Sequence, residues 1–487
     1  MSLLMLLTLL CFGKRTLGTS ESIHFVPTYG AYSSSTASSP TTSPANEFLS
    51  IHHITIVGNK KTKDEIIYRE LQVRAGEKVA QKDLEEILKQ DRDKLINTQL
   101  FLKVDISKID LPDDQIAIVV SVEERCYILP IPIFELADRS FNEWWINQNH
   151  DFSRVDYGMR FYHNNVRGMG EKVGITTQFG FNKKIEFSYL VPYLNRLQRL
   201  GLKIALAYKE SKNIAYKTQD HRQCFWKSDS VLKKNFESSL TCILRYNFYT
   251  YHYFMLQFYH NTIADIVAVL NPHYFLQAKT LQRIFALSYE LKRDQRDYAS
   301  YPLEGFLVKA KVEKLGLGIF DDINRFNFLA TAEHYFNLNK GFYFSHSVSA
   351  RFSFSDKQPY NAFKGLGYGD SLIRGYDLYV IEGQSYVLNK TDFKKWILSG
   401  EKYLGRWVPL NEFRTLPYTL YLKLCFDWGL VNNTINDPAN TRLVNRLLYG
   451  GGIGIDVVTY YDIAMGWSYA INSSGESGFF FRVSTMF

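Results

Sequence analysis

The feature that most constrains the fold is the regular alternation of residue types in GFYFSHSVSARFSFS, residues 341–355. Five large apolar residues, one histidine and one alanine take every second position, and serine, tyrosine or arginine stand between them. This period of two predicts a β-strand with one apolar and one polar face. Strands of water-soluble sheets average about 5 to 6 residues, whereas a strand that crosses a bilayer needs about 9 to 11. The length of this segment therefore favours a membrane-spanning strand.

The same alternation returns from residue 126 onward, in segments separated by connections that are mostly tight and long in turn. Short turns at one end and longer loops at the other are typical of outer-membrane barrels, and only closure of the sheet satisfies every backbone group in lipid. We therefore predict an all-β transmembrane antiparallel barrel of sixteen strands over residues 126–487. The connection 399–416 departs from the rule because it is long where a short turn is expected. The candidate strands are residues 126–137, 155–164, 171–181, 184–193, 199–215, 235–249, 251–268, 280–295, 304–317, 325–339, 341–355, 383–398, 417–430, 447–458, 461–472 and 478–487.

Composition agrees with this class and argues against others. The chain has 33 tyrosines and 35 phenylalanines, and no apolar run after residue 20 approaches the roughly 18 residues of a membrane helix. The net charge of +8 is spread over 487 residues, so nucleic acid is not an expected partner. The five cysteines show no CxxC spacing and the eleven histidines no HExxH pattern, so we expect no metal and no cofactor. No grouping of serine, histidine and aspartate suggests an enzyme.

The first 50 residues read as export and tether rather than as folded structure. MSLLMLLTLLCF is a short apolar stretch, and small residues near position 20 could form a cleavage zone, so residues 1–20 are expected to be a signal peptide. Its boundary stays open, because Lys14 and Arg15 follow the apolar stretch instead of preceding it. Residues 21–50 contain the Ser/Thr/Pro-rich run SSSTASSPTTSPANE and are expected to be a disordered linker.

Residues 51–125 form one small α+β unit with the expected order β-α-α-β-β. IHHITIVGN reads as a strand that ends in a Gly-Asn turn, and Thr62 with Glu65 predicts a capping box that opens the first helix. A second helix and two alternating strands follow. Four residues of the last strand should face the helices, and an edge strand of such a sheet can pair with a peptide strand; alternatively, the unit is only a spacer. The four residues are Ile116, Ile118, Val120 and Val122.

An arginine in a long connection has a plausible partner on a predicted strand. Arg374 lies in DSLIRGYDL, residues 370–378, and the alternation of YTLYLKLCFDWGL, residues 418–430, directs Asp427 into the barrel lumen. A loop folded into the lumen would bring the guanidinium to this carboxylate in bidentate geometry. The alternative is a loop arginine in solvent. Glycines that would let the loop turn and approach the next strand closely stand at 365, 367, 369, 375, 450, 451, 452 and 454.

Two distant motifs and the amino-terminal unit together resemble the BamA/TamA-type outer-membrane assembly superfamily. GN after the first strand and INTQLFLKVDI after the second helix resemble a POTRA domain. IRGY and CFDWG are similar to the family's loop motif and to the strand motif that faces it, although Cys425 stands where the family usually has Phe or Gly. The resemblance implies that the loop motif lies inside the barrel against Asp427 and Gly429. The loop-motif residues are Ile373, Arg374, Gly375 and Tyr376.

The resemblance also implies a function. Members fold β-barrel proteins into the bacterial outer membrane through a loosely paired seam between their first and last strands, with the POTRA domain in the periplasm. Unfolded outer-membrane proteins, outer-membrane lipids and accessory lipoproteins are the implied partners. Here Pro130 and Pro132 stand in the first strand, where proline cannot donate to the ladder, and Phe481 and Phe487 stand in the last. Alternatively, the two prolines only mark where the first strand begins.

Two other functions remain open from the sequence. A polypeptide secretion transporter of the same superfamily would share the barrel and the arginine loop, but such proteins usually carry two POTRA domains and a plug helix. A passive porin would leave the POTRA unit and the Arg374 loop without a role. Trp144 and Trp145 read as membrane-interface residues or as a loop cap, and Arg351 and Lys423 read as charges that face the lumen.

Overall fold

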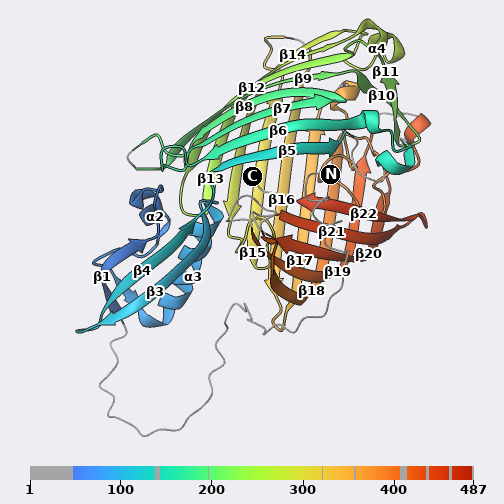
Figure 1. The fold of residues 1–487 in the computed structure, drawn as a ribbon. Helices are drawn as coiled ribbons and strands as arrows, with labels where there is room; N and C mark the ends of the chain where they lie inside the picture. Colours follow the sequence, from blue (N-terminus) through green and yellow to red (C-terminus); the bar gives the residue numbers. More distant parts are fainter. Residues whose placement is uncertain are drawn as a thin grey trace.

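The computed structural model describes residues 48–137, 143–147, 149–195, 197–320, 322–355, 358–405, 414–434, 438–459 and 463–484. The expected signal peptide, residues 21–47 of the expected linker, and Phe487 lie outside these ranges. The chain forms a small α+β unit followed by a large curved sheet (Figure 1). This is the predicted fold class.

The small unit is a four-stranded sheet with two helices. Its strand order is β2-β1-β4-β3, with β1 parallel to β4 and the other pairs antiparallel. The three-residue strand β2 was not predicted. The four residues expected to face the helices are buried in one core with Ile66, Leu84 and Leu95. The elements are β1 (Phe48–Val57), α2 (Asp64–Glu70), β2 (Lys78–Ala80), α3 (Gln81–Asn97), β3 (Phe101–Leu111) and β4 (Gln115–Glu124).

The predicted capping box at Thr62 is wrong. Helix α2 begins at Asp64, and its N-cap residue Lys63 makes no side-chain capping bond. The Thr62 hydroxyl is instead buried, 2.8 Å from the Tyr127 hydroxyl, and accepts a hydrogen bond of 2.9 Å from the Asn165 side-chain amide. Thr62 is not the N-cap residue, and its hydroxyl connects the small unit to the first strands of the large sheet.

The large sheet has sixteen antiparallel strands in the predicted sequence order. Its order departs from chain order once, where β9 pairs with β12 and the hairpin of β10 (Asn213–Gln219) and β11 (Arg222–Lys227) stands apart. The sixteen strands are β5 (Ile128–Leu136), β6 (Val155–Asn164), β7 (Lys172–Gly180), β8 (Asn182–Val191), β9 (Leu200–Ser211), β12 (Lys233–Arg245), β13 (Thr250–Ile263), β14 (Leu281–Asp294), β15 (Gly305–Leu315), β16 (Arg325–Asn337), β17 (Phe342–Phe354), β18 (Ser385–Tyr403), β19 (Thr415–Asn432), β20 (Leu447–Thr459), β21 (Ile463–Asn472) and β22 (Ser477–Ser484).

Short helices occupy some of the connections between these strands. They are the π-helix η1 (Glu143–Asn147), the 3-10 helices η2 (Phe152–Arg154), η3 (Tyr360–Ala362) and η6 (Pro438–Asn440), and the α-helix α4 (Asp265–Leu270). Among the helices of the described residues, none combines the length and the hydropathy that a membrane crossing needs.

Side chains alternate across the barrel wall as the sequence predicts. On β19 the outward Leu422, Leu424 and Phe426 are about half exposed, whereas Cys425 and Asp427, between and after them, are buried inside. The strands β18 and β19 are longer than expected, because their pairing continues to Tyr403↔Thr415. Both ends of the connection 399–416, which was expected to be long where a short turn is typical, therefore belong to strands, namely residues 399–403 and 415–416.

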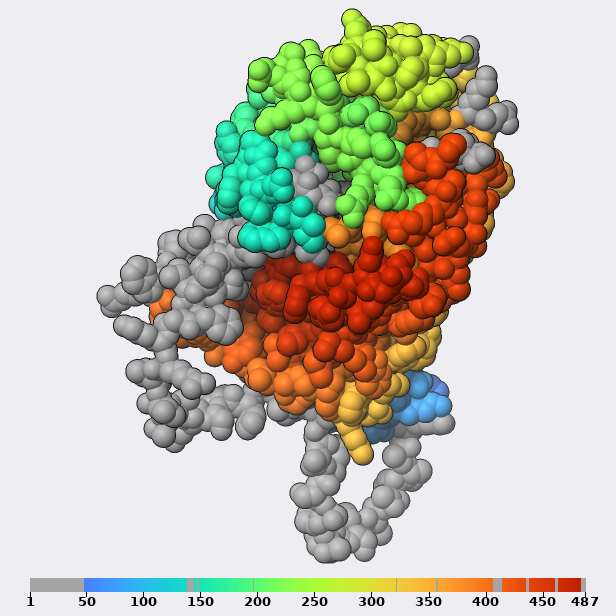
Figure 2. Space-filling view, turned by 90° about the vertical axis from the view of Figure 1, so that its right-hand side faces the viewer, coloured from blue at the N-terminus to red at the C-terminus, as the bar shows by residue number. Residues whose placement is uncertain are grey.

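The sheet has two free edges. Strands β5 and β22 end the strand order, and within the described residues no backbone pairing joins them. Figure 1 shows β22 well below β5 and not alongside it. Figure 2 shows the last strands, in red, and the first strands of the barrel, in blue-green, in separate areas of one face. The wall of the barrel is therefore unpaired at this position.

Candidate functional site

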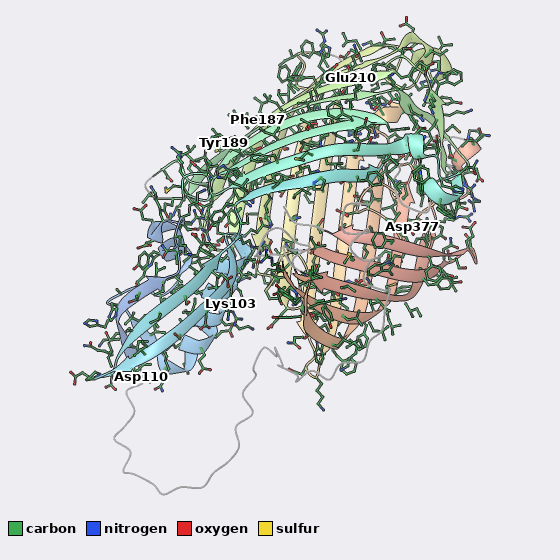
Figure 3. All side chains as sticks on the ribbon, in the orientation of Figure 1. Lys103, Asp110, Phe187, Tyr189, Glu210 and Asp377 are labelled. Atoms are coloured by element: carbon green, nitrogen blue, oxygen red, sulfur yellow. The ribbon has the colours of Figure 1, made fainter. Side chains whose placement is uncertain are left out.

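Most of the connection between β17 and β18, which we call the lumen loop (residues 358–384), folds into the barrel instead of running over its surface. Its residues Leu366, Ile373 and Tyr376 pack in one buried cluster with Val431 and Leu448 of the barrel wall. A bridge between Leu366 and Ile381 closes the loop on itself, and Figure 3 shows its Asp377 within the ring of strands. The loop is therefore part of the protein core.

Arg374 makes the contact that the sequence suggested. Its backbone N–H donates to Asp427 Oδ2 over 3.0 Å and its Nε donates to the same oxygen over 2.7 Å, while Nη2 donates to Asp427 Oδ1. Asp427 is completely buried and Arg374 is 8% exposed. The guanidinium thus donates to both carboxylate oxygens in the bidentate geometry that arginine, and not lysine, can provide.

A second carboxylate, Asp392 on β18, completes the site. It accepts a hydrogen bond from Arg374 Nη1 and stands opposite Cys425 in the β18–β19 register. The sequence reasoning missed Asp392, although the period of two places it on the lumen face of β18. Lys423 lies on the same wall as Asp427 and donates to Asp456 over 2.6 Å, so it faces the lumen as expected. The arginine is therefore held by charges from two adjacent strands.

Three glycines allow the loop to lie against the wall. Gly375 has φ +90°, a conformation that favours glycine, and a Cβ there would lie 2.9 Å from Asn472 Cβ. A Cβ on Gly450 of β20 would lie 2.1 Å from the Arg374 carbonyl oxygen, closer than any real contact. Gly429 lies under the loop, where a Cβ would be 2.8 Å from Ile373 Cδ1. The close approach explains why glycines stand here.

The loop motif also reaches the hairpin between β21 and β22. The Tyr376 hydroxyl lies 2.7 Å from Ser473 Oγ, and Asn472 donates through its side-chain amide to the Gly375 carbonyl over 2.7 Å. The Tyr379 hydroxyl donates to Glu476 over 2.7 Å. The motif therefore ties together the strands that precede the free edge of β22.

The four residues expected at the seam are not brought together. Pro130 and Pro132 lie in β5 and pair in uninterrupted register with Phe161 and Met159 of β6. Phe481 pairs with Trp467 of β21, with ring centres 5.2 Å apart. Phe487 lies outside the described residues. Pro130 and Phe481 thus stand on opposite free edges.

A contact between the small unit and the barrel was not foreseen from the sequence. Arg245, at the end of β12, donates to both carboxylate oxygens of Glu70 of α2, over 2.7 and 2.6 Å, and both residues are buried. Burial is the largest single influence and raises the pKa of Glu70, but the charge and hydrogen bonds of Arg245, together with the charges of Arg69 and Lys94, outweigh it, and the net pKa is below its usual value. Single charged residues at the ends of helices and strands follow no sequence pattern, so nothing in the sequence indicated this ion pair.

Further contacts extend this interface along the same end of the barrel. The Arg69 guanidinium lies 3.5 Å from the centre of the Tyr193 ring, and Lys94 Nζ lies 3.8 Å from the centre of the Phe248 ring. The Asn97 amide donates to the carbonyl of Arg296 over 3.0 Å. The small unit is therefore docked on the barrel at several points and not merely tethered to it.

Comparisons with known proteins agree with this architecture. Residues 49–125 match the POTRA family, described as a surface antigen variable number repeat, and residues 165–487 match the Omp85 superfamily domain. BamA from Haemophilus ducreyi lacking POTRA domains 1–3 is 15% identical, with a TM-score of 0.51 over 90% of this chain and 85% of that one. CdiB from Escherichia coli is 12% identical, with a TM-score of 0.54 over 90% and 76%. No curated protein matches the chain. At these identities the two structures share a fold with this chain.

Proposed function

Because the chain belongs to the Omp85 superfamily, we propose that it helps to fold and insert β-barrel proteins into the bacterial outer membrane. The family and the POTRA match make the chain an outer-membrane barrel with its POTRA domain on the periplasmic side. Within this frame the proposed role is non-enzymatic. Its partners are unfolded outer-membrane proteins and outer-membrane lipids, with accessory lipoproteins as further candidates.

The observation that carries the proposal is the unpaired seam between β5 and β22. A free strand edge presents a row of backbone donors and acceptors to which another strand can add. The β5–β6 register continues through Pro130 and Pro132. Because proline on an edge strand is tolerated where its missing N–H faces away from the ladder, the open edge of β5 lacks donors at these two positions. Closure with β22 is weakened, and an incoming strand meets an available edge.

The Arg374 site supports this role as a positioning device. It fixes the lumen loop to Asp427 on β19, and the same loop holds the β21–β22 hairpin through Tyr376 and Asn472. Strands that precede the free edge are therefore held from inside. We infer that this keeps the edge of β22 in a defined position while a client strand pairs with it.

The POTRA domain supplies a second surface for unfolded chains. Among the described strands, the edge strand β3 pairs with β4 alone, so its other edge is available. Asp110 lies at the end of β3 that is far from the barrel, and Lys103 lies nearer to the barrel (Figure 3), so this edge runs from the tip of the domain toward the barrel. A client segment can add to this edge by main-chain hydrogen bonds before it reaches the barrel seam.

The test is the folding rate of a urea-unfolded outer-membrane protein into liposomes that contain this protein. Empty liposomes and liposomes with Arg374→Ala are compared, and Arg293→Ala is the matched control because Arg293 is an exposed arginine of β14. We expect acceleration by the native chain and by Arg293→Ala, and its loss in Arg374→Ala.

Two results would contradict the assembly role. A folded barrel that gives no acceleration over empty liposomes would favour polypeptide secretion by the same superfamily. Steady ion conductance that is unaffected by Arg374→Ala, again without acceleration, would favour a passive porin.

A further inference from the structure

A polar cavity of about 250 Å³ lies inside the barrel, at the end opposite the POTRA domain, and the proposed function does not use it. We call it the upper-lumen pocket. The two ends of strand β12 define the position of the pocket. Lys233, at the start of the strand, lines the pocket, whereas Arg245, at its end, contacts the POTRA domain. The β10–β11 hairpin, the lumen loop, the connection between β13 and β14, and the ends of neighbouring strands contribute the rest of the lining, with Asn213, Tyr274, Tyr360, Asn361 and Lys364 among its residues.

The pocket lies in a cluster of cations. Lys364 lies in the lumen loop, outside the strands; partial loss of hydration lowers its pKa, the nearby charges of Lys233 and Lys209 lower it further, and the charge of Glu382 opposes them only in part. Arg351 donates to the Lys364 carbonyl, which brings a fourth cation to the cluster. The only hydrogen bond to the Lys233 amine recorded among the described residues is with the Tyr274 hydroxyl, over 3.2 Å.

Carboxylates do not balance these charges. Within the described part of the chain, no acidic oxygen lies within 4.0 Å of the amines of Lys209, Lys233 or Lys364. The nearby acid Glu382 accepts hydrogen bonds from Thr218 over 2.6 Å and from Tyr368 over 3.3 Å, and forms no ion pair with these lysines. Lys209 and Lys364 are exposed and Lys233 is half-buried, so water reaches the cluster; like charges held close together still repel one another, and an anion relieves that repulsion. The cluster is therefore a site for an anion.

The other lining groups specify more than a charge. The side-chain oxygens of Asn213 and Asn361 are buried without a hydrogen-bond partner among the described residues, and Asn213 is only 8% exposed. Such acceptors suit hydroxyl or amide donors on a ligand. Tyr274 and Tyr360, with ring centres 5.8 Å apart, add an aromatic wall. Together these groups match a polyol ring that bears a negative group.

We propose that the upper-lumen pocket binds an anionic sugar, a monosaccharide unit that carries a phosphate or a carboxylate. Lys233 and Lys364 contact the anionic group, the two asparagine oxygens accept from sugar hydroxyls, and the tyrosine rings pack against the sugar face. The unit can be free or be the headgroup of a glycolipid, and the chemistry of recognition is the same.

The test is titration calorimetry of the full chain in detergent with glucose 6-phosphate, glucuronate, glucose and inorganic phosphate. We expect the two anionic sugars to bind at least tenfold more tightly than glucose or phosphate. Lys233→Gln and Lys364→Gln should each weaken binding at least tenfold. Lys234→Gln is the matched control, because Lys234 is the next residue of β12 and is exposed; it should bind as the native chain does. A phosphorylated glycolipid in nanodiscs forms a separate arm, and binding there but not of the free sugars would assign the headgroup source.

Three results would overturn the proposal. One is the absence of binding in every arm by a barrel whose fold is confirmed by circular dichroism. Another is binding of inorganic phosphate as tight as that of glucose 6-phosphate. The third concerns the free protein: Lys233→Gln should raise its melting temperature because it removes an uncompensated cation, and a lowered one would show that the charge was already paired.

Discussion

At the scale of single residues, the Arg374 site shows how several charges can be stable inside a barrel. A buried charge is tolerated only where partners are held in good geometry, because the loss of hydration is otherwise too large. Asp427 provides a bidentate partner, Asp392 takes the remaining guanidinium nitrogen, and Gly450 lets the loop come close enough. The arginine therefore converts a flexible connection into a fixed internal part.

A double-mutant cycle measures this coupling. Removing one partner of a buried pair costs about 3–5 kcal/mol, because the other charge is left uncompensated. We expect Arg374→Ala and Asp427→Ala each to lower the free energy of unfolding of the barrel by an amount of that order, and the double variant to lower it by less than their sum. Urea unfolding in lipid gives the three values. Strict additivity would mean that the two residues do not act as a pair.

At the scale of elements, the seam depends on two prolines in β5, which lack the backbone N–H groups that other residues would donate. Pro130 and Pro132 keep β5 in register with β6 but supply no N–H groups. The edge of β5 is therefore a weak partner for β22.

Replacing both prolines by valine tests it, because valine restores the two donors and has high β-propensity. We expect a higher melting temperature, since β5 and β22 can then pair, and slower folding of a client protein by the closed barrel. The measurement is a melting curve beside the liposome folding assay. If closure and activity are both unchanged, the prolines only mark the start of the strand.

The elements also show how far sequence reasoning reaches. The sixteen strands follow a period of two that lipid on one side and the lumen on the other impose at every step, so they could be predicted. The hairpin β10–β11 and the strand β2 could not, because short strands outside the barrel wall carry no such alternation. The Arg374–Asp427 contact was accessible because both residues belong to motifs. Asp392 and the Glu70–Arg245 pair lie outside any motif, and only tertiary contacts reveal them.

At the scale of the whole molecule, the POTRA domain and the barrel form a docked pair. The Glu70–Arg245 contact lies at the centre of this interface, and Lys89 of α3 adds an ion pair with Glu304 at 3.2 Å. A cavity of about 440 Å³ remains between the two parts. Docking therefore fixes the position of the POTRA domain relative to this end of the barrel.

Acid should weaken this docking. The net pKa of Glu70 in the docked state is below the usual 4.5, so its ion pair favours docking above that pH, and the contribution is lost as the pH falls through the lowered value. We expect the distance between spin labels at positions 108 and 340 to lengthen or broaden below about pH 4.5, in a chain whose native cysteines are replaced. Glu70→Gln should show no such transition, and one that persists in it would assign the effect to other groups.

The central claim is that a client strand pairs at the seam between β5 and β22, and site-specific photo-crosslinking tests it most directly. A photoreactive phenylalanine is placed at Phe134 of β5, at Phe481 of β22 and, as a control on the far wall, at Phe328 of β16, while an unfolded outer-membrane protein folds into liposomes. Adducts between the client's terminal strand and the first two positions, without adducts at the third, are predicted. Equal labelling of all three, or labelling of Phe328 alone, would contradict the account.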